Sequence, residues 1–147
     1  MAQINTGKVV LGGLLAGLII NISEFVANMW VFAGPFEEII AELDVEAVGG
    51  GGITIYVLFG FVIGLVAVWL YAAMRPRFGP GARTAMMAGG AVWVLARLWP
   101  MTDFTVFLSL PTGLFVWGLI WTLVETLAAA VAGAWLYQED GKSSLGT

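Results

Sequence analysis

Four long apolar stretches, separated by short polar segments, set the strongest limit on how this chain can fold. They cover about residues 8–32, 53–74, 84–104 and 113–137. A helix needs about 20 residues to cross the roughly 30 Å hydrocarbon core of a bilayer, and three of the four stretches meet that length easily. The third weakens at Pro100. The segment FTVFLSL (residues 104–110) either continues it past a proline kink or forms a separate interfacial segment.

The composition is that of a membrane protein rather than a soluble domain. Hydrophobic residues make up 60% of the 147 residues and charged residues 11%, whereas soluble domains are about 45–50% apolar and about 25% charged. A chain of this length most simply forms one domain. We therefore expect a single all-α transmembrane domain over residues 1–147, a four-helix bundle embedded in the lipid bilayer.

Several chemistries lack the residues that they need. The chain has no cysteine and no histidine, which excludes disulfides, thiolate nucleophiles and histidine-based metal or haem ligation. Six basic residues against ten acidic ones leave no basic patch for nucleic acid. No serine has a partner base in the sequence pattern. We therefore expect no enzymatic activity, no cofactor, no metal site and no nucleic-acid partner.

The charges of the connecting segments predict the orientation in the membrane. Residues 35–52 carry five acidic residues and no lysine or arginine, whereas residues 74–83 carry Arg75, Arg77 and Arg83. Because positively charged loops stay in the cytoplasm, we expect both termini to be cytoplasmic and the acidic segment to lie outside. The alternative, a signal peptide cleaved before Gly34, fits the long first stretch and its polar residues poorly.

The acidic segment has the pattern of a short amphipathic helix over about residues 36–47. Acidic residues fill most of the helix, but one face is apolar and is formed by Phe36, Ile39, Ile40, Leu43 and Ala47. We expect this helix to lie on the outer membrane surface as a lid over the bundle; a docking patch for a basic partner or a cation is the alternative. The glycines at 49–52 would then free the chain to return into the membrane.

Small residues mark helix faces that can approach one another closely. Gly13 and Gly17 are four residues apart in the first stretch, and Gly60 and Gly64 repeat this spacing in the second. This is the G-x-x-x-G pattern of close packing between transmembrane helices. Gly118 belongs to a similar stripe in the fourth stretch. The faces on the first two stretches favour assembly with a second copy or with a larger membrane complex.

Five polar residues would meet lipid unless they turned inward: Asn21, Glu24, Asn28, Arg97 and Glu125. An unpaired charge at the bilayer centre costs roughly 3 kcal/mol by insertion scales, so Arg97 needs an anion. We predict a pair with Glu24, in which Asn21 and Asn28 satisfy the remaining hydrogen bonds; Asp103 is a rival partner. No second cation is left for Glu125, which we therefore expect to be protonated unless water reaches it.

These residues have two interpretations. A structural ion pair would fix which helix packs against which, whereas intramembrane ionisable groups also mark proton, ion or substrate paths. We favour the structural interpretation and expect a non-enzymatic bundle that self-associates or serves as an accessory subunit of a membrane complex. The alternative is a small proton-linked or ion/solute transporter that uses Glu24, Arg97 and Glu125. The deep tryptophans are expected to pack rather than to line a pigment or quinone pocket: Trp93, Trp117 and Trp121.

Three segments together resemble a known group of proteins. They are INTGKVVLGGLLAGLIINISEF (residues 4–25), WLYAAMRPRFGPGARTA (69–85) and LVETLAAAVAGAWLY (123–137). The chain resembles an uncharacterised family of small bacterial four-span integral membrane proteins, and the RPRFGPG turn is the most distinctive part of the likeness. The resemblance implies four spans and a bacterial cytoplasmic (inner) membrane, and it brings no assigned activity.

Overall fold

The structure, a computed structural model, describes residues 4–44, 46 and 48–137. Over these residues the protein is all-α. Four helical stretches are long and apolar enough to cross a membrane: Thr6–Val31, Gly50–Phe78, Ala82–Leu108 and Thr112–Leu136. The four-helix bundle expected from the sequence is confirmed, and the length and composition of its helices are those of a multi-pass membrane protein.

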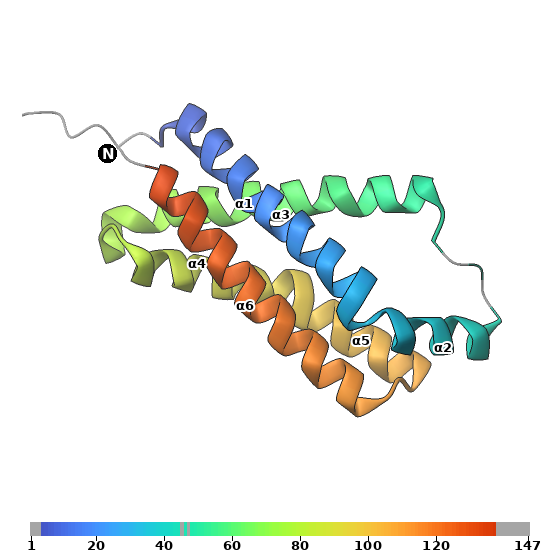
Figure 1. Ribbon diagram of the computed structural model, residues 1–147. Helices are drawn as coiled ribbons and strands as arrows, with labels where there is room; N and C mark the ends of the chain where they lie inside the picture. Colours follow the sequence, from blue (N-terminus) through green and yellow to red (C-terminus); the bar gives the residue numbers. More distant parts are fainter. Residues whose placement is uncertain (1–3, 45, 47, 138–147) are drawn as a thin grey trace, which may run out of the picture.

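The helices run back and forth between two ends of the molecule (Figure 1). They are α1 (Thr6–Val26), α2 (Ala33–Leu43), α3 (Gly50–Phe78), α4 (Ala82–Trp93), α5 (Trp99–Leu108) and α6 (Thr112–Leu136). The start of α1, the end of α6 and the α3–α4 turn lie at one end, here called the terminal end. The α5–α6 turn and α2 lie at the other, the distal end (Figure 1).

The third span is one helix that passes through Pro100. A π-helical segment, Val94–Leu98, joins α4 to α5, and Pro100 lies in the first turn of α5. Proline has no N–H, and its ring clashes with the carbonyl four residues earlier, so a regular α-helix would be strained here. The wider π turn shifts the hydrogen bonds just before the proline. Residues 104–108 therefore continue the third span and are not a separate segment.

The distal amphipathic helix begins and ends earlier than the sequence pattern suggests. It covers Ala33–Leu43, and Asp44 ends it in the left-handed conformation with φ 51°. A left-handed residue is a common helix terminator, and aspartate tolerates it. Glu46, inside the expected range 36–47, is not helical, and residues 45 and 47 lie outside the described part. The glycines from Gly50 onwards already form the first turn of α3.

The closest helix contact joins α1 to α3 through glycines. A Cβ atom on Gly64 would overlap the Gly17 nitrogen and the Gly13 carbonyl oxygen, and one on Gly60 would come within 2.7 Å of the Asn21 side chain. Gly64 thus meets Gly13 and Gly17 inside the chain, and Gly60, one turn earlier on α3, meets Asn21 on the same face of α1. They are not free to hold a second copy. Close backbone approach of this kind stabilises transmembrane packing through dispersion contacts.

Small residues also bring α6 against α1 and α4. Gly12 meets Gly133 between α1 and α6, and Gly89 meets Ala130 between α4 and α6. The core beside these contacts lies in the terminal half of the bundle and is built mainly from small residues, including Ala16, Val68, Ala72, Ala85, Ala88 and Ala129. Gly118, by contrast, faces α5, because a Cβ atom on it would come within 2.8 Å of Met101 Cε.

Two tyrosines tie the terminal end together. The Tyr137 hydroxyl accepts a hydrogen bond from the Asn5 N–H (3.2 Å), and the Tyr71 hydroxyl accepts one from the Gly81 N–H (3.2 Å). Their rings meet edge to face at 6.0 Å, and the Arg75 guanidinium lies over both of them at 5.9 and 5.4 Å. These contacts join the start of α1, the end of α6 and the α3–α4 turn.

The glycine crossing makes a direct prediction. Gly64→Ala should lower the free energy of unfolding by about 1–3 kcal/mol, because the new methyl group must push α1 and α3 apart. Gly90→Ala is the matched control, since its Cβ atom meets nothing within 4 Å and alanine favours a helix by about 0.5–1 kcal/mol over glycine. Unfolding followed by circular dichroism in mixed detergent micelles would measure both. Equal stabilities of the two variants would contradict the close α1–α3 contact.

Candidate functional site

Three spans bring charged side chains together inside the bundle. Glu24 comes from α1, Arg97 from the π-helical segment between α4 and α5, and Glu125 from α6. Arg97 Nη2 lies 2.7 Å from Glu24 Oε1 and donates a hydrogen bond of 3.1 Å to Glu125 Oε1. These three residues are called the charge cluster below. One guanidinium nitrogen thus contacts carboxyl groups from two other helices.

The charge cluster is closed on one side and partly open on the other. The Glu125 side chain is 1% exposed, whereas those of Arg97 and Glu24 are 20% and 31% exposed. Glu125 therefore lies in the core, and Glu24 faces the edge of the bundle. Arg97 lies between them and connects the buried carboxyl group to the accessible one.

The polar atoms of the charge cluster are not all satisfied within the described residues. Glu125 Oε2 and Arg97 Nε are buried and have no hydrogen-bond partner there. Buried polar atoms are nearly always hydrogen-bonded in stable cores. The two ion pairs therefore leave hydrogen-bonding capacity on buried atoms of the charge cluster unused within the described residues.

The ion pair expected between Arg97 and Glu24 is present, and so is the expected hydrogen bond from Asn28, but the expected bond from Asn21 is not. Asn28 Nδ2 does donate to Glu24, to its Oε2 at 3.3 Å and to its carbonyl oxygen at 2.7 Å. Asn21 Nδ2 donates instead to the carbonyl oxygens of Gly17 and Val57, across the α1–α3 contact. Its place on the α1 face next to α3 turns it away from the charge cluster.

Glu125 also departs from the expectation that no cation would be left for it. It shares Arg97 with Glu24. The rival partner Asp103 is exposed on α5. A guanidinium presents several N–H donors in a fixed plane, so one arginine can serve two carboxyl groups. Sequence reasoning assumed that each cation pairs with one anion, and it therefore missed this arrangement.

Tryptophan and hydroxyl side chains surround the charge cluster. Trp121 Nε1 donates to Ser23 Oγ at 3.0 Å, next to Glu24 in the chain. Trp93 Nε1 donates to Thr122 Oγ1 at 3.1 Å, between the third span and α6. Sequence reasoning assigned these tryptophans to packing and did not find the two bonds. The spacing could have indicated that these tryptophans lie near the charge cluster. Trp93 is one helical turn before Arg97, and Trp121 is one helical turn before Glu125.

Both π-helical segments lie beside the charge cluster. Val94–Leu98 contains Arg97, and Ala27–Val31 begins three residues after Glu24 and contains Asn28. A π turn inserts one extra residue and rotates the following side chains relative to a regular α-helix. Such turns are frequent at functional sites. Their position here fits a local adjustment of both helices around the charged side chains.

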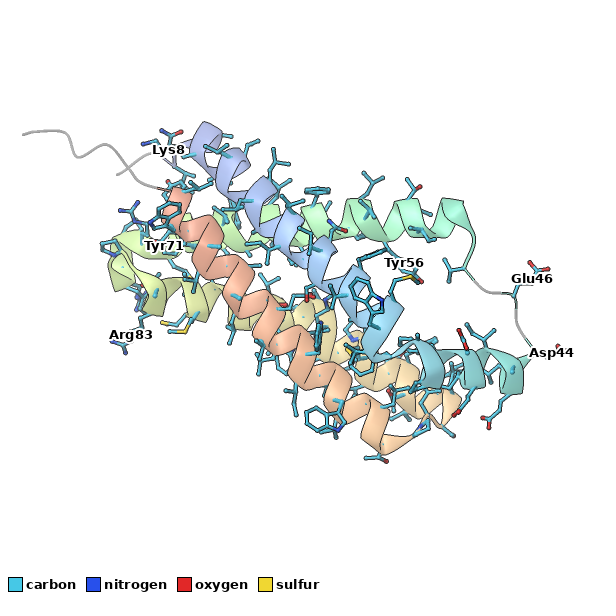
Figure 2. The ribbon with its side chains drawn as sticks, in the orientation of Figure 1. Lys8, Asp44, Glu46, Tyr56, Tyr71 and Arg83 are labelled. Atoms are coloured by element: carbon cyan, nitrogen blue, oxygen red, sulfur yellow. The ribbon has the colours of Figure 1, made fainter. Side chains whose placement is uncertain are left out.

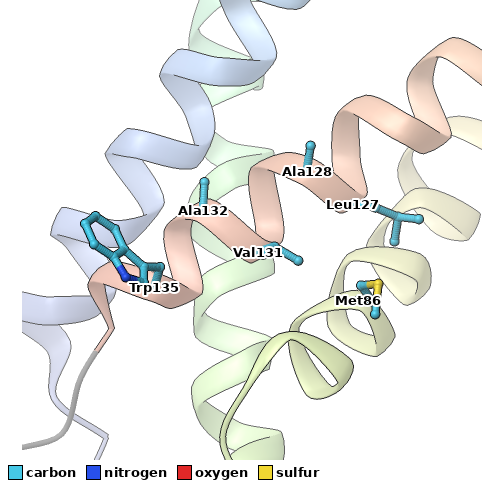
Figure 3. A pocket seen from close by; sticks show the side chains of 6 residues that line it. All are labelled: Met86, Leu127, Ala128, Val131, Ala132 and Trp135. Carbon is cyan, nitrogen blue, oxygen red and sulfur yellow. The ribbon is translucent and has the colours of Figure 1, made fainter.

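Two pockets of the described surface lie away from the charge cluster. One, of about 620 Å³, is lined by apolar side chains of α4 and α6 (Figure 3): Met86, Leu127, Ala128, Val131, Ala132 and Trp135. The other, of about 550 Å³, lies between α2 and the start of α6 and includes Glu38, Glu42 and Trp117. Neither pocket is lined by Glu24, Arg97 or Glu125. They therefore do not form a path to the buried carboxyl group.

Comparisons of the chain with protein-family models, with curated proteins and with solved structures find no match. What the protein does must therefore be argued from its own geometry. Its main features are the charge cluster with its hydrogen bonds and the exposed apolar surfaces of the helices.

The charge cluster predicts a specific coupling. Arg97→Leu should lower the free energy of unfolding more than the double change Arg97→Leu with Glu24→Leu, because the single change leaves a carboxylate without its partner. The coupling energy should lie between about 0.5 and 3 kcal/mol. The same cycle with Asp103→Leu is the control and should be additive to within about 0.5 kcal/mol. Additive losses in the Glu24 cycle would show that the contact stabilises nothing.

Proposed function

We propose that this protein is a non-enzymatic bundle of a bacterial cytoplasmic membrane that self-associates, with both termini in the cytoplasm. The distribution of charge supports the orientation. Lys8 and Arg83 lie at the terminal end, whereas Asp44 and Glu46 lie at the distal end (Figure 2). Because arginine and lysine are retained on the cytoplasmic side, the terminal end would face the cytoplasm. The resemblance to small bacterial four-span proteins supports the choice of membrane.

The distal half of α3 carries the proposal of self-association. Every residue from 53 to 59 is exposed, and Tyr56, Leu58 and Phe59 are each about 60% exposed or more. Seven consecutive residues cover all sides of an α-helix, which makes one turn in 3.6 residues. A helix that faced lipid on one side and the bundle on the other would alternate between exposed and buried positions. Apart from the hydrogen bond from Asn21 on α1 to the Val57 carbonyl oxygen, this half of α3 is therefore left largely uncovered by the other helices of the described chain.

A second helix at the same end is also open. No residue of α5 is buried, and its large apolar side chains are among the most exposed in the protein: Trp99, Phe104, Val106 and Phe107. In one chain, α3 and α5 do not cover each other, because α3 crosses α1 at its glycines and then diverges from the bundle (Figure 1).

A second copy supplies both missing surfaces at once. In a two-fold arrangement the same pair of surfaces meets twice, so α3 of one copy could pack against α5 of the other and the reverse. Transmembrane helices associate through dispersion contacts between well-fitted apolar surfaces. An accessory role in a larger complex would use the same surfaces with a different partner. The glycine faces, which favoured assembly from the sequence, no longer support it, because they are used within the chain.

Native mass spectrometry from nanodiscs tests this proposal. We expect a dimer or a higher homo-oligomer that persists at low protein-to-lipid ratio. A co-purifying membrane protein of fixed stoichiometry in place of a second copy would support the accessory role instead. A strictly monomeric species without a partner would overturn both forms of the assembly proposal.

Engineered cysteines locate the contact, since the natural chain has none. Leu58→Cys on α3 and Val106→Cys on α5 are both well exposed, and a mixture of the two variants in one membrane should form a disulfide-linked dimer under mild oxidation. Leu14→Cys on α1, which is 46% exposed in the terminal half, is the matched control and should remain monomeric when mixed with Val106→Cys. Equal crosslinking of both mixtures would indicate random collision rather than a defined interface.

A small proton-linked or ion/solute transporter is the second candidate. The observation in its favour is one guanidinium shared by two carboxyl groups inside the spans, since intramembrane ionisable groups often mark proton or ion paths. Proteoliposomes that contain a pH-sensitive dye would report proton movement. Transport predicts a flux that Glu125→Gln abolishes and Glu38→Gln, on exposed α2, leaves unchanged. A wild-type flux equal to that of empty liposomes, with and without candidate solutes, would argue against this function.

A further inference from the structure

The charge cluster contains more acidic than basic groups. Two carboxyl groups face one guanidinium, whose Nη2 lies 2.7 Å from Glu24 Oε1 and 3.1 Å from Glu125 Oε1. With both carboxyl groups ionised, the charge cluster would carry one net negative charge between membrane-spanning helices. A net charge at that depth is strongly unfavourable. Something positive must therefore accompany the three side chains.

No other basic residue of the described chain occupies that position. Lys8 and Arg83 lie at the terminal end (Figure 2). Arg75 and Arg77 are in the last turn of α3, which leads into the α3–α4 turn at the same end (Figure 1). The remaining titratable group on the third span is Asp103, an acid exposed on α5. The charge cluster therefore cannot be neutralised from within its own surroundings.

The oxygen atoms of Glu125 point to the nature of the missing charge. Oε1 accepts a hydrogen bond from Arg97, whereas Oε2 is buried without a partner in the described residues. An ionised carboxylate oxygen that is buried without a donor keeps the full cost of an unsolvated charge, and protonation of the carboxyl group removes that charge. No group of three or more Asp, Glu, His or Cys residues that could hold a metal ion occurs in the described chain. A proton is the cation that fits these atoms.

We propose that Glu24, Arg97 and Glu125 form a binding site for a single exchangeable proton, which the two carboxyl groups hold in common. In the loaded state one carboxyl group is protonated and the other forms the ion pair with Arg97, so the charge cluster is neutral. In the empty state both are ionised and the net charge is −1. Loading transfers a proton from hydronium to a carboxylate oxygen and leaves water; release is the reverse.

The exposure of the side chains gives the direction of exchange. Glu24 is 31% exposed and Glu125 1%, so Glu24 is the carboxyl group through which we expect the proton to enter and leave. Arg97 contacts both carboxyl groups, so it can pair with whichever one is ionised. The site does not depend on self-association, and each can fail without the other.

Infrared difference spectroscopy between acidic and alkaline buffers, on the protein reconstituted in lipid, tests the site. The wild type should show the C=O stretching band of one buried protonated carboxyl group per chain, which disappears at alkaline pH. Glu24→Gln and Glu125→Gln should each abolish the band, because either change leaves one carboxylate paired with Arg97. Arg97→Gln should increase the band about twofold, because both carboxyl groups must then be neutral.

Glu38→Gln on α2 is the matched control and should leave the band unchanged, because that carboxyl group lies on the exposed distal helix. Glu24→Gln keeps the size of a partly exposed side chain, so the test stands even where Glu125→Gln does not fold. A band that persists in Glu24→Gln and disappears only in Glu125→Gln would overturn the shared site. A wild-type spectrum without such a band would overturn it as well. Native mass spectrometry of the same preparation reports association separately.

Discussion

The sharing of one arginine by two carboxyl groups is the interaction that links three of the four spans and on which the proposed proton site depends. Arg97 joins the third span to α1 through Glu24 and to α6 through Glu125. Inside a membrane there is little hydrophobic force to choose between helix neighbours, because lipid is as apolar as the side chains. A charge that must find its partner selects the neighbours instead. Asn28 donates a hydrogen bond to Glu24, and π-helical segments contain Asn28 and Arg97, so the helix geometry is irregular beside the charged side chains.

The bundle is divided into a packed half and an open half. In the terminal half, glycines and alanines bring α1, α3, α4 and α6 close together, and the tyrosines tie the chain ends to the α3–α4 turn. In the distal half, α3 and α5 bury no side chain of their own. The charge cluster lies between these halves. The charge cluster has one closed side and one more exposed side, and the proposed proton site uses this difference.

The sequence predicted the positions of the spans well, because apolar length is a local property. It also predicted the pair of Arg97 and Glu24, since an isolated intramembrane charge has few possible partners. It did not predict that Glu125 joins the same arginine or that Asn21 bonds to the Val57 carbonyl oxygen. Both depend on how the helices are rotated about their axes, and for Arg97 the π-helical segment Val94–Leu98 also changes that rotation. The end of α2 at Leu43 was missed for a local reason, the left-handed Asp44.

The sequence by itself determined that this chain has four apolar helices, that its connecting segments differ in charge, and that few ionisable groups lie within the spans. These properties follow from the composition of each segment and from the 3.6-residue period of the helix. Both can be read from residues that are close together in the chain. Only the tertiary structure decided that the G-x-x-x-G faces meet each other inside the chain, that one guanidinium serves two carboxyl groups, and that the distal halves of α3 and α5 are left open. Crossing angles and helix rotations decide such contacts, and these arise from packing between residues far apart in the chain.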